Sequence, residues 1–393
     1  MILLKLLLWI PTIIISINIL VLFIECLSAL WFKNKDNGDN QAVNTDYRLI
    51  IPAHNEASCL GKTLESLVTQ VNQPEQILVI ADNCTDATAV IAREYGVTVV
   101  ERFNTEKRGK GYALAYGLQQ LEANPPEVVL FFDADCLVGE NTVKELTQKA
   151  IATGKPIQAL YLMEKPEQPT PKDTISAFAF LVKNWVRPLG LTTLGLPCLL
   201  TGTGMAFPWG VINQVSLDHG NIVEDMQLGI DVALAGYPPL FLPTAKVIGI
   251  LPQKEQISTQ QRKRWEHGHL QTIITQVPTL IKGAMTQLSF PLLSLALELS
   301  VPPLSLLVMF WGLTLILTVG GGLLLGIWLP ALVLILAGLL LFIAIITAWA
   351  KFAQKEIPLK SLILIPVYLL SKVTIYFNFL GKRESQWVKT QRD

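Results

Sequence analysis

Two aspartates that follow a buried strand are the residues in this sequence best suited to hold a metal ion. The stretch Val128–Cys136 reads V-V-L-F-F-D-A-D-C, and its five consecutive apolar residues predict a strand buried on both faces. If the chain stays extended, Asp133 and Asp135 point the same way, because side chains two positions apart share one face. Two close carboxylates need a cation between them. Oxygen ligands suit Mg²⁺ or Mn²⁺, which can in turn hold a phosphate.

Further polar residues are expected at the same edge of the sheet. Apolar strands that alternate with amphipathic helices from Tyr47 onward predict a doubly wound, mainly parallel sheet. Open sheets of this kind bind ligands beyond the carboxyl ends of their strands. The residues that fall there, or at the start of the third expected helix, are Pro52, Asn55, Glu56, Asp82 and Lys110. Each cluster alone is typical of a turn, but together they predict a pocket for a nucleotide diphosphate held through a metal.

The composition places part of the chain in a membrane and argues against a nucleic-acid-binding protein. Of 393 residues, 51% are hydrophobic and only 16% are charged, whereas a typical soluble domain has about 25% charged residues. Basic and acidic residues both number 31, so there is no net basic field of the kind that attracts nucleic acid. The apolar surplus lies at the two ends. We therefore expect a soluble α/β domain between segments that contact membrane lipids.

The sequence predicts five segments, and their charges predict an orientation. They are a transmembrane anchor (1–33), a polar linker (34–46), a soluble domain (47–276), interfacial and transmembrane helices (277–381) and a basic tail (382–393). Lys33 and Lys35 follow the anchor, against the single Lys5 before it, which favours a cytoplasmic domain. We expect a multi-pass protein of the cell membrane whose soluble domain and tail face the cytoplasm.

The C-terminal third contains apolar stretches of different lengths. Leu304–Leu323 and Trp328–Ala350 are long enough to span a bilayer, whereas Leu288–Leu299 is too short and is expected to lie in the interface. Ser361–Leu380 has basic residues on both sides. If it crossed the membrane, one of these basic segments would face outward, against the positive-inside rule, so an interfacial or re-entrant helix is favoured.

Six short motifs occur in order along the soluble domain, and as a set they resemble one enzyme family. They are I-P-A-H-N-E (51–56), A-D-N-C-T-D (81–86), F-D-A-D (132–135), T-G-T-G-M (201–205), E-D (224–225) and Q-R-K-R-W (261–265). The set resembles the family 2 glycosyltransferases. More narrowly, it resembles their membrane-embedded branch, which includes cellulose, chitin, hyaluronan and poly-N-acetylglucosamine synthases. This resemblance implies a GT-A-like nucleotide-diphospho-sugar transferase fold with flanking transmembrane helices.

The resemblance also implies a role for each motif. Asp225, with Glu224 beside it, would be the general base that takes the proton of the acceptor hydroxyl, and in-line attack would invert the anomeric centre. Asp133 and Asp135 would hold Mg²⁺ or Mn²⁺, which neutralises the departing diphosphate. The residues implied in donor binding are Pro52, Asn55, Glu56, Asp82, Lys110, Asp133 and Arg264. Those implied in acceptor binding are Thr201, Gly202, Gly204, Gln261 and Trp265.

Several of these residues also have a purely structural interpretation. Glu224 and Asp225 favour the N-terminus of a helix whether or not they act on a substrate. Trp265 is also typical of a core or a membrane interface. His267 and His269 are expected at the surface, because an H-x-H pair places its two rings on different sides of a helix.

The leading functional hypothesis is an inverting transfer from a UDP-sugar to a growing β-linked glycan, since Q-R-K-R-W resembles the processive synthases. The alternative is the addition of a single sugar to a membrane lipid, which the short membrane part favours. A transporter or receptor with a degenerate nucleotide-binding domain would be favoured if Asp135, Asp225 or Trp265 had been lost. All three are present.

Overall fold

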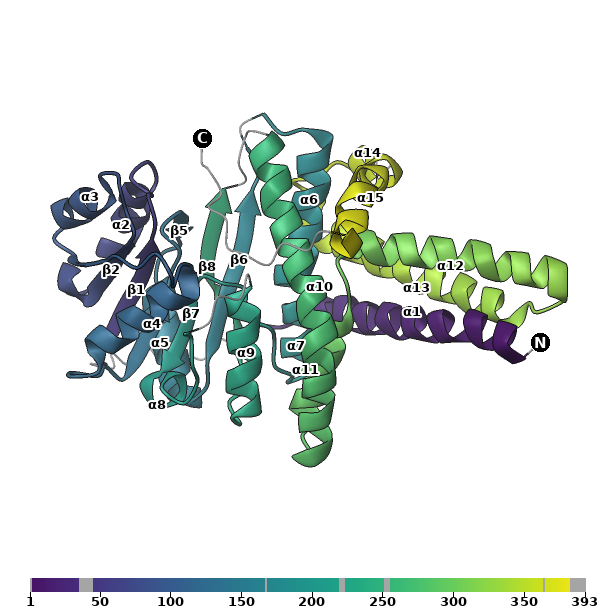
Figure 1. Cartoon of the computed structure of the whole chain (residues 1–393), viewed down its shortest axis with the longest axis horizontal. Coiled ribbons are helices and arrows are strands. Elements are labelled where there is room, and N and C mark those ends of the chain that lie inside the picture. The colour runs from purple at the N-terminus through teal and green to yellow at the C-terminus, as the bar shows by residue number, and fades with distance from the viewer. Residues whose placement is uncertain are drawn as a thin grey trace.

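The computed structural model describes residues 2–34, 45–166, 168–218, 223–250, 255–362 and 365–381. It has an α/β domain at one end and a bundle of long helices at the other, and two helices run across the base of the bundle (Figure 1). These two are α10 (Glu255–Thr286) and α11 (Phe290–Ser300). Most of the expected linker and the whole basic tail lie outside the described residues.

The strands of the described chain form one sheet in the order β3-β2-β1-β4-β7-β6-β8-β5. The four strands β3-β2-β1-β4 pair in parallel, which confirms the arrangement expected from the sequence. Beyond β4 the sheet is mixed, because β7 is antiparallel to both of its neighbours and β5 is antiparallel to β8. The strands are β1 (Tyr47–Ala53), β2 (Ile77–Asp82), β3 (Thr98–Arg102), β4 (Val128–Phe131), β5 (Cys136–Val138), β6 (Ile157–Glu164), β7 (Met205–Pro208) and β8 (Leu240–Ile250).

Helices cover both faces of the sheet and bury an apolar layer on each. Leu64 of α2 and Leu146 of α5 lie in one layer, while Leu114 of α4 and Val232 of α9 lie in the other. Full burial of such a side chain contributes about 1.5–3 kcal/mol, which explains why the helical spacing of apolar residues predicts these elements. The helices of this domain are α2 (Leu60–Val68), α3 (Thr88–Glu94), α4 (Lys110–Leu121), α5 (Thr142–Thr153), α6 (Pro171–Leu181), α7 (Arg187–Thr193), α8 (Trp209–Ile212) and α9 (Glu224–Leu234).

The strand expected from the five apolar residues 128–132 is β4, which ends at Phe131, and a turn follows, so the chain does not stay extended through Asp133 and Asp135. The amide of Asp133 donates a hydrogen bond to the hydroxyl of Thr203 at 3.0 Å. The backbone amide of Asp133 is thus paired with a side chain, beyond the point where the strand pairing of β4 ends. The chain then begins β5 at Cys136 and pairs with β8 at the far edge of the sheet. The two aspartates therefore lie on a turn between strands.

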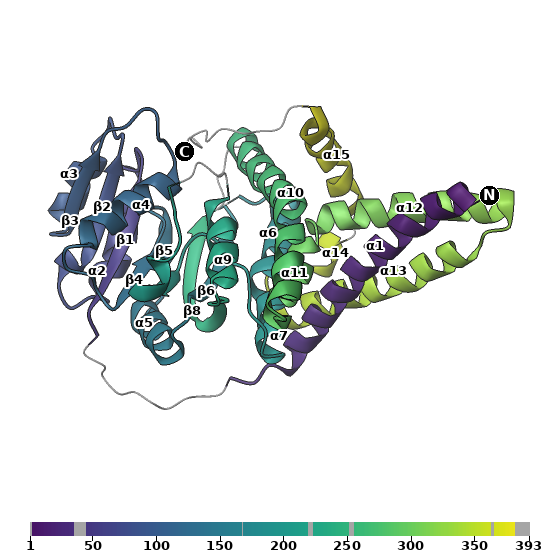
Figure 2. The same cartoon turned by 60° about the horizontal axis from the view of Figure 1, so that its bottom comes forward.

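Three helices of the described chain are long and apolar enough to cross a membrane. They belong to α1 (Ile2–Ser28), α12 (Leu304–Leu325) and α13 (Leu329–Ala348). Figures 1 and 2 show α1 alongside the other two, with the N-terminus at the end of the bundle farthest from the sheet. The shorter helices α14 (Leu359–Leu362) and α15 (Ile365–Gly381) follow, and α15 lies within the segment expected to be interfacial.

A buried ion pair joins α1 to the α/β domain. The guanidinium of Arg187, at the start of α7, contacts the carboxylate of Glu25 with an Nε–Oε2 distance of 2.5 Å. Arg187 also donates to the carbonyl of Glu298 at 2.8 Å, and all three side chains are buried. At Gly190, one turn later, an added Cβ would lie 1.9 Å from the carbonyl oxygen of Glu25, so only glycine allows this approach. The anchor and the domain are thus tightly packed at this point.

Candidate active site

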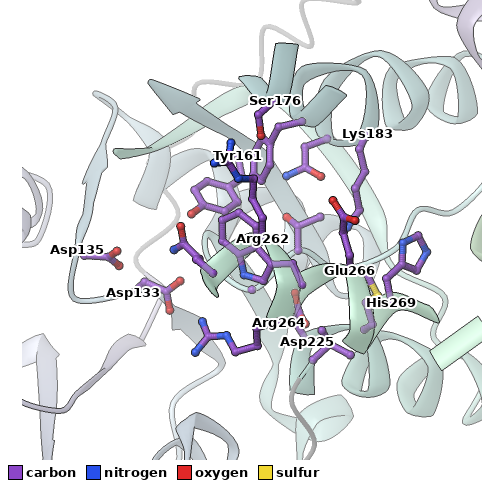
Figure 3. A pocket seen from close by; sticks show the side chains of 18 of the residues that line it. Asp133, Asp135, Tyr161, Ser176, Lys183, Asp225, Arg262, Arg264, Glu266 and His269 are labelled. Carbon is purple, nitrogen blue, oxygen red and sulfur yellow. The ribbon is translucent and has the colours of Figure 1, made fainter. Parts of the chain in front are cut away.

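One cavity of about 870 Å³ brings together most of the residues that the sequence singled out. It lies between the carboxyl ends of the first strands, the start of α9 and the first half of α10. Figure 3 shows Asp133 and Asp135 at one end of it and Asp225 and Arg264 nearer the middle. The predicted site residues that line it are Pro52, Glu56, Asp82, Lys110, Asp133, Asp135, Thr201, Gly202, Glu224, Asp225, Gln261, Arg264 and Trp265.

Asn55 and Gly204 do not line this cavity. Asn55 has a left-handed backbone (φ 55°), and its side-chain oxygen accepts a hydrogen bond from the Thr85 amide at 2.6 Å. Gly204 (φ 64°) faces the sheet, where an added Cβ would lie 2.8 Å from Ala159. Both residues therefore shape the loops that carry the site.

Lys110, the first residue of α4, stands at the centre of the acidic residues. Its ammonium lies 2.5 Å from Asp133 Oδ1 and 3.6 Å from Glu224 Oε1, and it donates to the carbonyl of Gly202 at 2.6 Å. Burial alone would lower the pKa of Lys110, but the charges of Asp133, Glu224 and Asp225 outweigh burial and raise it. The lysine is therefore a fixed positive charge in the cavity.

Glu224 and Asp225 form the first turn of α9. Burial raises the pKa of Glu224 to about 7, and the charge of Asp225 adds to this rise while Lys110 opposes it. Asp225 lies close to the T-G-T-G-M loop, because a Cβ added to Gly202 (φ 97°) would be 3.2 Å from Asp225 Oδ2. The loop glycine thus lets the backbone approach the carboxylate, as expected of a close-packed loop at this site.

The pKa of Glu224 predicts how stability depends on pH in the absence of nucleotide. Its folded value of about 7 lies above the ordinary 4.5, so between these pH values the folded chain binds more protons than the unfolded chain. Stability therefore falls as the pH rises through this window. We expect Glu224→Gln to stabilise the protein at pH 8 by on the order of 1–3 kcal/mol, and to have little effect at pH 5. Thermal unfolding of the purified variant at both pH values measures this, and equal shifts at both would contradict it.

The two aspartates of the F-D-A-D motif suit a hard cation, but only as part of a larger ligand set. Asp133 and Asp135 both line the cavity, and no third Asp, Glu, His or Cys converges with them among the described residues. Magnesium is commonly bound by one or two carboxylates, with substrate phosphates and water completing the shell. The residues present therefore fit a divalent ion that arrives with a nucleotide diphosphate.

The expected donor end of the cavity is held by a second ion pair. Asp82 is buried at the end of β2, and Arg102 at the end of β3 contacts its Oδ1 at 2.6 Å. Burial raises the pKa of Asp82, against the hydrogen bond and charge of Arg102. His54 places its Nδ1 2.6 Å from the Asp82 carbonyl oxygen, so β1 and β2 are tied together where they end.

Helix α10 carries the Q-R-K-R-W residues into the cavity and corrects one expectation. Trp265 lines the cavity and packs against Phe180 with a ring-centroid distance of 6.0 Å. His267 and His269, expected at the surface, are 1% and 4% exposed. His267 is buried because α15 covers it, and its Nε2 lies 2.9 Å from the carbonyl oxygen of Ile375. His269 lines the cavity.

The sequence alone did not identify several residues that build the site. Gln158 on β6 is fully buried, donates to the Thr203 carbonyl at 2.9 Å and accepts from the Thr201 amide at 2.8 Å. It thereby fixes the T-G-T-G-M loop, and a glutamine inside an otherwise apolar strand was its only signal. Lys183 also lines the cavity, and the signal there is a lysine within the apolar run F-L-V-K-N-W-V.

Comparison with known proteins agrees with this geometry. Residues 45–268 match the family described as glycosyltransferase like family 2. The 4,4'-diaponeurosporenoate glycosyltransferase of Staphylococcus aureus (strain N315) is 31% identical over 125 residues, which are 30% of this chain and 32% of the relative. This chain thus matches about a third of the length of that relative.

A solved structure extends the likeness to the fold of nearly the whole chain. The mannosyltransferase PcManGT from Pyrobaculum calidifontis, in complex with GDP-Man and Mn²⁺, superposes with a TM-score of 0.54. The two are 18% identical, and the match covers 94% of this chain and 100% of the other. The GT-A-like α/β fold expected from the sequence is therefore confirmed. With its family model and its fold in agreement, this chain belongs to glycosyltransferase family 2 and is a glycosyltransferase.

Proposed function

We propose that this glycosyltransferase transfers a sugar from a nucleotide-diphosphate donor, a UDP-sugar in the first instance, to a lipid acceptor in the membrane, with inversion at the anomeric carbon. One observation carries the proposal. The cavity that holds the F-D-A-D and E-D residues extends to Leu22 of α1, to the 301–303 connection and to the first residues of α12. An acceptor that stays in the lipid can thus bring its head to Asp225.

The chemistry follows from the charges at the two ends of the site. A divalent ion bound by Asp133 and Asp135 would neutralise the diphosphate as it leaves. Lys110 and Arg264 line the same cavity and add donors for phosphate oxygens. Asp225 would accept the proton of the attacking hydroxyl, and Glu224 beside it would be the second candidate base. Trp265 offers an apolar face on which a sugar ring can stack.

A second candidate function is extension of a β-linked glycan, as in the cellulose, chitin and hyaluronan synthase branch. The Gln261–Trp265 motif favours it, because Gln261, Arg264 and Trp265 all face the cavity. The first candidate is preferred for two reasons. The first is that the name of the Staphylococcus aureus relative gives a lipid-like acceptor, 4,4'-diaponeurosporenoate. The second is that the described chain has three candidate spans, and such a short membrane part favours addition of a single sugar to a lipid.

The test is to incubate the purified full chain with labelled UDP-sugars and GDP-mannose, a membrane lipid extract and Mn²⁺. A single labelled lipid product of fixed mass supports the first candidate. A ladder of products supports the second. Absence of any transfer or donor hydrolysis across the panel would overturn both.

Metal dependence is tested by Asp135→Asn. Even outer-shell partners of a bound metal contribute about 10- to 100-fold to its affinity, so losing a direct ligand should cost at least as much. We expect Mn²⁺-dependent binding of UDP or GDP to fall by that factor in calorimetry. Glu140 is exposed on the loop before α5, so Glu140→Gln is the control and should bind UDP or GDP as wild type does. Equal nucleotide affinity with and without a chelator would rule the metal out.

Membrane orientation is tested by cysteine labelling. We propose that the N-terminus and the turn between α12 and α13 face outward and that the site faces the cytoplasm, where nucleotide sugars are made. An impermeant reagent on intact cells should label Gly326→Cys and leave Lys355→Cys unlabelled until the cells are permeabilised. The reverse pattern would place the site outside.

A further inference from the structure

The membrane end of the cavity carries a positive charge that has no contact partner among the described residues. Lys183 lies on the π-helical turn η3 (Val182–Val186) between α6 and α7, and its side chain lines the cavity. It makes no hydrogen bond or ion pair with any residue that the structure describes. Figure 3 shows Lys183 and His269 at the end opposite Asp133 and Asp135. π-Helical turns are rare and occur frequently at functional sites.

Among the described residues, most charged groups around Lys183 are already paired or neutral. Arg187 is paired with Glu25, and Lys372 is paired with Glu266. Burial raises the pKa of Glu298 to about 8, so Glu298 is largely protonated at neutral pH and does not offset the lysine. Asp225 acts on it only from a distance. Lys183 is partly buried and faces the cavity, and burial lowers the pKa of its ammonium. An anion in the cavity would favour the charged form, so this position is suited to an anionic ligand.

His269 supplies a second unsatisfied group at the same end. It is 4% exposed and lines the cavity, and its Nε2 has no hydrogen-bond partner among the residues that the structure describes. Burial lowers its pKa well below the ordinary value, and Lys183 and Arg187 add to this, so the ring is neutral. The backbone of Leu299 takes the hydrogen bond of the other ring nitrogen. Nε2 is therefore a free acceptor that an O–H group can satisfy.

An apolar surface continues from this end toward the membrane bundle. A small apolar pocket adjoins the cavity and shares Ala179, Leu304 and Tyr368 with it. Its other walls include Val308 of α12 and Ile345 of α13, two of the helices long enough to cross a membrane. A hydrocarbon chain that leaves the cavity here would remain against apolar side chains.

We infer that Lys183 and His269 form a headgroup subsite for an acidic amphiphile, a lipid whose head carries, beside the hydroxyl that is glycosylated, a carboxylate or a phosphate monoester, and whose tail lies along Leu304 and Val308. The ammonium of Lys183 binds an anionic oxygen of the head. Nε2 of His269 accepts a hydrogen bond when the head also carries an O–H, as a phosphate monoanion does. This inference rests on the proposed function, because it assigns the chemical class of the membrane acceptor.

Three amphiphiles with the same dodecyl tail test the subsite: dodecyl phosphate, tridecanoate and dodecanol. The full chain is released from a non-ionic detergent, and the binding of each amphiphile to it is compared by native mass spectrometry. Since hydrogen bonds to charged groups are stronger than neutral ones, both anions should bind wild type about tenfold more tightly than the alcohol. Lys183→Met should abolish this preference with dodecanol binding unchanged, and Lys183→Arg should retain it. Lys144→Met, an exposed lysine on α5, is the matched control.

The outcomes separate the possible sources and the two proposals. If His269→Phe weakens the binding of the phosphate amphiphile more than that of the carboxylate, the result indicates a phosphate head. If both affinities change equally, the result indicates a carboxylate head. If wild type does not prefer the anions over dodecanol, or if Lys183→Met and Lys183→Gln keep the preference, the subsite is overturned. Calorimetry with UDP and GDP runs in parallel. A chain that binds neither nucleotide contradicts the proposed function without altering the amphiphile comparison.

Discussion

Asp225→Asn is expected to lower turnover about a hundredfold or more, the scale of general base catalysis, while nucleotide affinity stays near that of wild type. The substitution keeps the size and hydrogen-bonding reach of the side chain and removes only its ability to take a proton. Asp225 lies beside the T-G-T-G-M loop, away from the F-D-A-D turn, so the binding of a diphosphate should not depend on it. Turnover and nucleotide binding must be measured on the same preparation.

Asp231→Asn is the matched control for this experiment. Asp231 lies on the same helix, accepts a hydrogen bond from Gln227 at 2.8 Å and does not line the cavity. Its variant should turn over normally. If Asp225→Asn also turned over normally, the base would have to be sought elsewhere, first at Glu224.

Arg187→Met is expected to lower the free energy of unfolding by about 3–5 kcal/mol, because it leaves the carboxylate of Glu25 buried without its partner. Glu25 is 2% exposed and lies on α1, one of the helices long and apolar enough to cross a membrane. In a thermal scan of the detergent-solubilised protein, the midpoint should fall by roughly 10 °C. The double variant Glu25→Met, Arg187→Met should recover most of this loss, since replacing both partners by apolar groups removes the uncompensated charge.

An exposed ion pair supplies the comparison. Arg93 and Glu101 are also 2.5 Å apart, but their side chains are 52% and 37% exposed. Arg93→Met should therefore cost less than about 1 kcal/mol. If Arg187→Met were as mild as Arg93→Met, the buried pair would not be what secures α1 to the domain.

The sequence predicts the first half of the domain well because local patterns decide it. The strands around Leu49, Val79 and Leu130 are continuous apolar runs, and the helices between them have helical spacing. The end of β4 could not be predicted, because Asp133 leaves the sheet through a hydrogen bond to Thr203, 70 residues further along the chain. Antiparallel pairing of β5 with β8 is likewise decided by distant partners.

The same contrast holds for the site. Motif order identified residues that line the cavity, since the I-P-A-H-N-E, A-D-N-C-T-D and F-D-A-D motifs each lie at or just beyond the end of a strand. The burial of His267 and His269 could not be predicted. Three basic residues and Glu266 closely precede the two histidines, which favours an exposed position, and the element that covers His267 comes 108 residues later. In the sequence, Lys183 is distinguished only as one cation in an apolar run. Whether a distant residue contacts it depends on the tertiary structure and could not be predicted.

The packing of α1 between late elements has a consequence for synthesis. About 275 residues separate the end of α1 from the start of α12, so at roughly 5–20 residues per second the ribosome needs on the order of 15–55 s to make its helical partner. Arg187, the partner of Glu25, emerges 162 residues after it. Until then the carboxyl group of Glu25, on the first candidate membrane helix, lacks this counterion. During translation Glu25 is therefore either protonated and neutral, or solvated by lipid headgroups, water or an insertion factor. A chain arrested before Arg187 should be the form most readily removed by membrane quality control.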